Sequence, residues 1–264
     1  MHISEFDYKL PNCLIAQKPI EPRHNSKLLS CINKNLKDLK FINLPNILNP
    51  GDVIIVNDTK VIKAKVIGKI NEKKISFTLH LKISKNKWFA FSKPAKKCKM
   101  NDHVIFSKNL NAKIVEKKIN GEILLAFNLS GKKLMNEISK CGHLQLPPYI
   151  KANSKNDDNN YQTYFAKNEG AIAAPTASLH FTSEILENLK SKKIIVVTIT
   201  LHVGAGTFMP IRDNIENHKM HSEVGFISNE VIELIKEKKS KKGRIISVGT
   251  TSLRLLESAA LSGE

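Results

Sequence analysis

The chain has 264 residues, of which 42 are lysine or arginine and 24 are aspartate or glutamate, giving a formal net charge of +18. Its 41% hydrophobic content is ordinary for a globular protein, and no apolar run reaches the roughly 18 residues of a membrane span. Four scattered cysteines without a Cys-x-x-Cys pair argue against a zinc ribbon or disulfide scaffold. We therefore expect a cytoplasmic protein with no signal peptide.

The positive charge is unevenly distributed. Residues 61–150 contain 19 lysines against five acidic residues, so most of the excess lies in one third of the chain. A lysine-rich composition can arise from compositional drift, but a local excess is the better footprint of a polyanionic partner. This distribution favours RNA or DNA binding.

Taken in chain order, the first element is the apolar run at 53–56, which ends at Asn57-Asp58-Thr59 and predicts a buried strand followed by a turn. Short alternating stretches then follow one another through residues 61–150, as in an antiparallel sheet or small barrel. Residues 133–142 predict a short helix ending at Gly142. The pair Pro147-Pro148 marks a rigid linker after it.

The remaining chain alternates strands with helices. Thr182 or Ser183 can cap one helix and Ser228 another, while residues 194–201 and 244–248 are apolar runs typical of buried strands. We predict a largely parallel α/β sheet domain, residues 1–60 and 151–264, interrupted by an antiparallel β-barrel, residues 61–150. Ligands of such a sheet bind at the carboxyl ends of its strands.

Two segments at such positions are rich in small residues. Residues 170–182 include Thr176, Ser178 and His180 before a helix amino terminus, which suits a carboxylate or another anion, although a tightly packed turn with capping residues is the more ordinary explanation. Residues 201–208 contain Gly204 and Gly206, which allow a ligand to approach the backbone. The third glycine of a dinucleotide fingerprint is missing, so we reject that motif.

Two further segments are polar. In residues 218–223 the paired histidines His218 and His221 lack a third ligand at metal spacing, so we expect no metal site. His221 or Glu223 is better suited to acid–base chemistry. In residues 248–254 hydroxyls stand at a strand-to-helix turn, where they could hold ribose or carboxylate oxygens or serve only as a helix cap.

These segments together resemble one family, the S-adenosylmethionine:tRNA ribosyltransferase-isomerases of queuosine biosynthesis. AAPTASLHFT, HVGAGTF and HKMHSE are its most specific motifs here. The matching stretches are residues 6–23, 51–65, 146–152, 161–182, 200–212, 218–223 and 249–260. The family continues beyond this point with further strands, so the resemblance implies a chain without the family's carboxyl-terminal part.

The resemblance implies the fold read above and a specific reaction. The ribosyl group of S-adenosylmethionine is transferred and isomerised onto 7-aminomethyl-7-deazaguanine at the wobble position of tRNA anticodons. Epoxyqueuosine in tRNA is formed, and adenine and methionine are released. S-adenosylmethionine is thus a co-substrate, and no cofactor or metal is expected. We further expect a monomer that binds no membrane.

The resemblance also suggests site residues. The expected catalytic residues are His221, His180 and Glu223. The residues expected to bind S-adenosylmethionine are Thr176, His202, Gly204, Gly206, Thr207, Thr250, Thr251, Ser252 and Arg254. The residues expected to contact tRNA or its modified base are Asp58, Lys60 and Lys65.

The chain departs from the family at three of the matched positions. Ser178 stands where the family usually has glycine, and Lys60 and Lys65 where it has arginine, so neither lysine can make a bidentate contact. Two other readings stay open. One is a truncated remnant that only binds tRNA, and the other is a generic nucleotide-binding α/β protein, which the absence of a P-loop disfavours.

Overall fold

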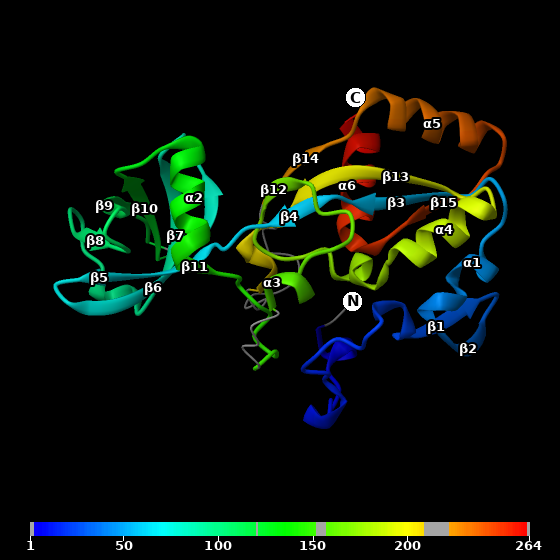
Figure 1. Ribbon diagram of the computed structural model, residues 1–264, viewed down its shortest axis with the longest axis horizontal. Helices are drawn as coiled ribbons and strands as arrows, with labels where there is room; N and C mark the ends of the chain where they lie inside the picture. Colours follow the sequence, from blue (N-terminus) through cyan, green and yellow to red (C-terminus); the bar gives the residue numbers. More distant parts are fainter. Residues whose placement is uncertain (1–2, 120, 152–156, 209–221, 263–264) are drawn as a thin grey trace. The chain divides into compact units, whose positions relative to one another are not determined.

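The computed structural model describes residues 3–119, 121–151, 157–208 and 222–262. The chain divides into two compact units (Figure 1). One comprises residues 1–60, 148–203 and 211–264, and the other comprises residues 61–147 and 204–210. The second unit therefore includes the glycine-containing segment that follows residue 203.

The first unit is built on a four-stranded sheet in the order β14-β13-β3-β15. Its strands are β3 (Val53–Asn57), β13 (Ile195–His202), β14 (Val224–Phe226) and β15 (Ile245–Ser247). β3 is parallel to β13 and β15, and only β14 is antiparallel. The predicted largely parallel sheet is confirmed, and β3 is buried throughout as its β-branched sequence requires.

Helices cover both faces of this sheet (Figure 1). The helices of the unit are α1 (Leu44–Ile47), α3 (Asp157–Asn160), α4 (Ser183–Ser191), α5 (Asn229–Ser240) and α6 (Gly249–Ser262). On one face, Ile185 and Leu189 of α4 pack against Ile54 and Val56. On the other, partly buried residues of α5 and α6 pack against Val53, Ile55 and Ile199.

The two helix caps predicted from the sequence are confirmed. The hydroxyls of Thr182 and Ser228 accept hydrogen bonds from the amides of Ile185 and Val231, as predicted for helix caps.

β13 was expected to be buried throughout, but Thr198 is exposed. Val196 packs against the α4 cluster, and Thr198, next along the same face, lies outside that cluster.

Two small sheets complete the first unit. They are the hairpin of β1 (Lys27–Ile32) with β2 (Asn35–Lys40) and the pair of β4 (Thr59–Val61) with β12 (Asn168–Ala171). β4 begins two residues after β3 ends, so its partner β12 is brought to the carboxyl end of the parallel sheet.

The second unit is a closed six-stranded antiparallel barrel in the order β5-β6-β7-β10-β9-β8, which pairing of β8 with β5 closes. Its strands are β5 (Lys65–Ile70), β6 (Lys73–Lys82), β7 (Lys87–Lys93), β8 (His103–Ile105), β9 (Asn111–Lys117) and β10 (Glu122–Phe127), and β11 (Gly142–His143) adds to β5. Closure leaves no free edge, and the predicted barrel is confirmed.

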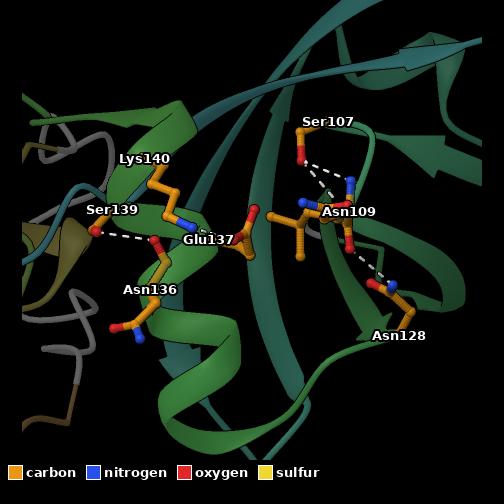
Figure 2. Close-up of polar contacts among 8 residues, drawn as sticks. Ser107, Asn109, Asn128, Asn136, Glu137, Ser139 and Lys140 are labelled. Carbon is orange, nitrogen blue, oxygen red and sulfur yellow. Dashed lines mark hydrogen bonds and ion pairs between the residues drawn. The ribbon is translucent and has the colours of Figure 1, made fainter.

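Figure 2 shows polar contacts of the barrel unit, hydrogen bonds between two of its loops and an ion pair on its helix. Asn128 donates its side-chain amide to the carbonyl of Asn109, while the Ser107 hydroxyl accepts from the Asn109 amide. Helix α2 (Gly131–Cys141) carries an ion pair between Lys140 and Glu137 at 2.6 Å.

Gly142 is the C-cap of α2, as predicted. Its backbone is extended rather than left-handed. A Cβ atom there would collide with the carbonyl oxygens of Lys63 and Ile138, so close backbone approach is what requires glycine.

Candidate functional site

Strand ends bring four polar residues together in the first unit. β3 and β13 run parallel with Asn57 opposite Ile199, so Asp58 and Thr59 emerge beside Thr200 and His202. The side chain of Asn57 bonds with both the amide and the carbonyl of Leu201, at 3.0 and 2.9 Å. The two strands are thereby held in register where a parallel sheet presents its ligands.

Asp58 is the charged centre of this edge. Its side chain is buried, and its Oδ1 accepts hydrogen bonds from the Thr200 hydroxyl at 2.6 Å and from the Asn168 amide at 3.1 Å. Asn168 also donates to the Thr200 oxygen at 3.0 Å. Such donors compensate for burial of the carboxylate, and its charge attracts an amine or a ribose hydroxyl.

His202 stands beside this carboxylate. Its Nδ1 shares a hydrogen bond of 2.8 Å with the hydroxyl of Thr59. Gly170 packs so closely that a Cβ atom there would lie 2.7 Å from Nδ1. Burial lowers the pKa of His202, and the nearby charge of Asp58 opposes this only partly. A neutral imidazole at neutral pH can accept a proton.

A second group of polar residues surrounds the amino terminus of α6. The sequence predicted a turn before the helix, but α6 begins at Gly249, so Thr250, Thr251 and Ser252 form its first turn. A Cβ atom on Gly249 would lie 3.1 Å from Ala177 Cβ, which brings α6 against the 3-10 helix η6 (Thr176–His180).

Several hydroxyls around the start of α6 have no hydrogen-bond partner among the described residues. Ser178 and Ser252 are fully buried. The hydroxyls concerned are those of Ser178, Ser247, Thr251 and Ser252. An unpaired buried hydroxyl costs about 1–3 kcal/mol. The amides of the first turn of α6, which the helix cannot satisfy internally, suit a ligand rich in oxygen atoms.

His180 ends η6 on the side of the amino-terminal segment. Its Nδ1 lies 2.9 Å from the hydroxyl of Ser26, and its ring is tilted against Phe41 with centroids 5.4 Å apart. Burial lowers the pKa of His180, and the positive charge of Arg23 lowers it further. This imidazole is therefore also held neutral and oriented.

The charged residues singled out in the sequence have partners of their own. Arg254 donates to Glu223 at 2.7 Å, and Glu223 is largely buried. Lys60 forms an exposed ion pair with Glu169 at 3.0 Å, a kind of contact that contributes little stability. Lys65 lies on β5 of the barrel, opposite Thr78 and His143.

The predicted residues thus fall into three groups. Those in the first unit are Asp58, Lys60, Thr176, His180, His202, Glu223, Thr250, Thr251, Ser252 and Arg254. Gly204, Gly206, Thr207 and Lys65 belong to the barrel unit, where the 3-10 helix η7 (Ala205–Phe208) contacts β6. His221, with His218, lies outside the described residues.

Sequence reasoning missed the residues that support these groups. Thr59, Asn168, Gly170 and Thr200 hold Asp58 and His202, and Ser26 holds His180. One signal was available, because Thr200 is a polar residue within the apolar run of β13. Asn168 lies in a polar stretch with nothing to distinguish it.

In the described part of the chain, no three His, Cys, Asp or Glu side chains gather as metal ligands would. Among the helices described, none has the length and apolar character needed to cross a membrane.

Comparisons with known proteins converge on one family. The family model for queuosine biosynthesis protein matches residues 3–263. S-adenosylmethionine:tRNA ribosyltransferase-isomerases of Brucella anthropi and Brucella ovis are each 43% identical, over 98% of this chain and 76% of theirs. The solved S-adenosylmethionine tRNA ribosyltransferase of Thermotoga maritima is 26% identical with a TM-score of 0.46, covering 97% of this chain and 73% of that one.

Proposed function

The chain belongs to the queuosine biosynthesis protein family, and on this premise we propose that it is an S-adenosylmethionine:tRNA ribosyltransferase-isomerase. The observation that carries the proposal is the 43% identity to enzymes of that name across nearly the whole chain. The buried Asp58 and the neutral His202 and His180 support it, because they supply a carboxylate and two neutral imidazoles in one unit.

The proposed reaction joins the ribosyl group of S-adenosylmethionine to 7-aminomethyl-7-deazaguanine at the anticodon wobble position. The sulfonium makes a neighbouring proton acidic, so a base must remove it, and adenine and methionine must leave. The modified base must also be extruded from its loop and held. The product is epoxyqueuosine in tRNA, and S-adenosylmethionine is a co-substrate rather than a cofactor.

We assign the acid–base work to His180, His221 and Glu223. His180 is supported by its lowered pKa and by the Ser26 bond that orients it. Glu223 is paired with Arg254, so in this role it acts together with the arginine. Replacing His221 with alanine is expected to abolish epoxyqueuosine formation without unfolding the protein.

S-adenosylmethionine is assigned to two surfaces. The methionine carboxylate and ribose hydroxyls are assigned to the first turn of α6, which carries Thr250, Thr251 and Ser252 and begins beside Ala177 of η6, together with Thr176 and Arg254. His202 and the glycine segment with Gly204, Gly206 and Thr207 are assigned to the ribose and sulfonium.

The tRNA is assigned to Asp58, Lys60, Lys65 and the lysine-rich barrel. Asp58 suits the amine of the modified base because a buried carboxylate binds a cation strongly. Lysines contribute affinity without sequence specificity. We place this activity in the cytoplasm, in a monomer that needs no metal or further cofactor.

Adenine release tests the proposal. The protein is incubated with S-adenosylmethionine, with tRNA carrying the precursor base, and with both. Adenine is expected only when both are present, and His180→Gln should reduce it strongly. Asn188→Ala, at an exposed position on α4 and outside the proposed site, is the control and should leave it unchanged. tRNA binding without any adenine would refute the enzyme and favour a binding protein.

A further inference from the structure

A hollow of about 410 Å³ opens in the first unit beside the amino terminus of α4. Arg23, Thr163, Tyr164 and Ser183 contribute to its lining. Arg23, Thr163 and Tyr164 fall within stretches that match the family, but none of them has a role in the proposed reaction. The hollow is lined by the amino-terminal segment and by the stretch just before β12, two regions that lie far apart in the sequence.

Arg23 brings an uncompensated positive charge to the hollow. Its guanidinium donates to the backbone carbonyls of Gln162 at 2.7 Å and of Asn159. Carbonyl partners fix the orientation of the group without neutralising it. No carboxylate pairs with Arg23 within the described ranges. A guanidinium in this state is suited to phosphate.

The helix terminus adds a second anion-binding feature. The amides of Ser183 and Glu184 belong to the first turn of α4, which the helix cannot satisfy internally, and Thr182 caps only the amide of Ile185. Independently, the Thr163 hydroxyl is buried, with the residue 7% exposed, and has no partner among the described residues. Thr163 lines the hollow but its hydroxyl oxygen is covered, so this unpaired donor reaches an acceptor bound there once its side chain rotates.

Tyr164 supplies a surface for a base. It is 57% exposed, and its ring lies nearly perpendicular to that of Phe165, with centroids 5.8 Å apart, so much of the Tyr164 ring is open to solvent. An aromatic ring beside a phosphate-binding group is the usual arrangement for holding a single-stranded nucleotide.

We propose that this hollow binds a nucleotide of the tRNA, with its phosphate on Arg23, Thr163 and the α4 terminus and its base stacked on Tyr164. The assignment rests on the proposed function for the identity of the RNA. Arg23 is also near enough to His180 to lower its pKa. The nucleotide would therefore bind close to a proposed catalytic residue. Glu21 lies at the exposed rim, where its charge opposes the phosphate.

Equilibrium binding of tRNA carrying 7-aminomethyl-7-deazaguanine, measured across a salt series, tests this assignment. Tyr164→Ala should weaken binding about fivefold or more with an unchanged salt slope. Arg23→Gln should weaken binding and reduce the slope of log K against log salt by about 0.7–0.9, the value for one phosphate contact. Thr163→Val should weaken binding, and Thr163→Ser should retain it.

Two controls have opposite expectations. Tyr149→Ala removes another exposed tyrosine of the same unit, 54% exposed, and should leave tRNA affinity unchanged. Glu21→Gln should tighten binding because it removes a repulsive charge. Wild-type tRNA affinity in Tyr164→Ala would overturn the assignment, and so would an equal loss of tRNA affinity in Tyr149→Ala. Neither result depends on whether the Arg23→Gln variant folds.

A second arm titrates adenosine monophosphate against the protein alone. Arg23-dependent binding of this mononucleotide, together with tRNA affinity that no substitution alters, would assign the hollow to a free nucleotide and overturn the RNA assignment. Adenine release by the wild type is measured in parallel. Release with no effect of the variants on tRNA binding refutes the hollow alone. Tyr164-dependent tRNA binding without release refutes the proposed function alone.

Discussion

The Thr200 hydroxyl donates to Oδ1 of Asp58 at 2.6 Å, and Asn168 donates to both of these oxygens. The three residues come from the end of β13, the turn after β3 and the start of β12. One buried carboxylate oxygen therefore joins three chain segments at the carboxyl edge of the sheet. The position of this Asp58 oxygen therefore depends in part on the hydroxyl of Thr200, a residue of β13.

Replacing Thr200 with valine keeps the shape of the side chain and removes the donor to Asp58. Loss of one of the two hydrogen-bond donors to this buried carboxylate should lower the free energy of unfolding by about 1–3 kcal/mol. Urea unfolding measures this cost. Thr198→Val is the matched control, because Thr198 is an exposed residue of the same strand and should change stability by less than about 0.5 kcal/mol. Equal stability of the two variants would contradict the account.

Gly170→Ala should displace the ring of His202. The added Cβ would lie 2.7–2.8 Å from three atoms of the imidazole, closer than real contacts allow. We expect a lower free energy of unfolding, by about 1–3 kcal/mol for overpacking, together with reduced adenine release. His202→Ala removes the obstructing ring, so the double variant should recover stability relative to Gly170→Ala but not activity. A double variant whose stability losses simply add would show that the clash is not with His202.

Arg23→Gln should raise the pKa of His180. Burial lowers that pKa first and the charge of Arg23 lowers it further, so removal of the charge leaves burial alone. The pKa should rise but stay below the ordinary value of 6.5. Histidine ring resonances followed by NMR across pH 4–8 report it, with Arg244→Gln as a control that removes an arginine not among the causes of the shift. An unchanged pKa in Arg23→Gln would exclude the electrostatic link.

Asp52 predicts a pH-dependent contribution to stability. Burial tends to raise its pKa, but hydrogen bonds from Arg244 and the Asn49 amide outweigh this and bring the pKa below its ordinary value of 3.8. Because the folded pKa is below the unfolded one, the stabilisation is fully present above about pH 4 and is lost as the pH falls through the folded value.

Unfolding of Asp52→Asn across pH 2–7 measures this contribution. The variant should be less stable than wild type at pH 7, and the difference should shrink as the medium becomes acidic. Asp38→Asn, at an exposed position on β2, should track the wild type throughout. A difference between wild type and Asp52→Asn that stays constant down to pH 2 would contradict the assigned shift.

The sequence predicted elements whose signal is local. The buried strand after residue 52, the caps Thr182 and Ser228, and the barrel with its short alternating strands all follow from patterns within a few residues. Gly142 was correctly predicted as the C-cap of α2, but its close approach to the carbonyl of Lys63, 79 positions earlier in the sequence, could not be predicted.

The supports of the site could not be predicted in the same way. Asn168 reaches Asp58 across 110 positions, and His180 reaches Ser26 across 154. The first contact depends on the pairing of β4 with β12, and the second depends on the packing of the amino-terminal segment. Patterns within a few neighbouring residues predict neither. The hollow at α4 likewise joins residues 21–23 to residues 159–164.

The fate of labelled S-adenosylmethionine shows whether this protein transfers a ribosyl group to tRNA. The protein is incubated with tRNA carrying the precursor base and with S-adenosylmethionine labelled with ¹³C either in its ribose or in its methyl group. The tRNA is then digested to nucleosides for mass spectrometry. Ribosyl transfer should place the ribose label, and not the methyl label, in the modified nucleoside. Methyl label in the nucleoside, or no label from either form, would contradict it.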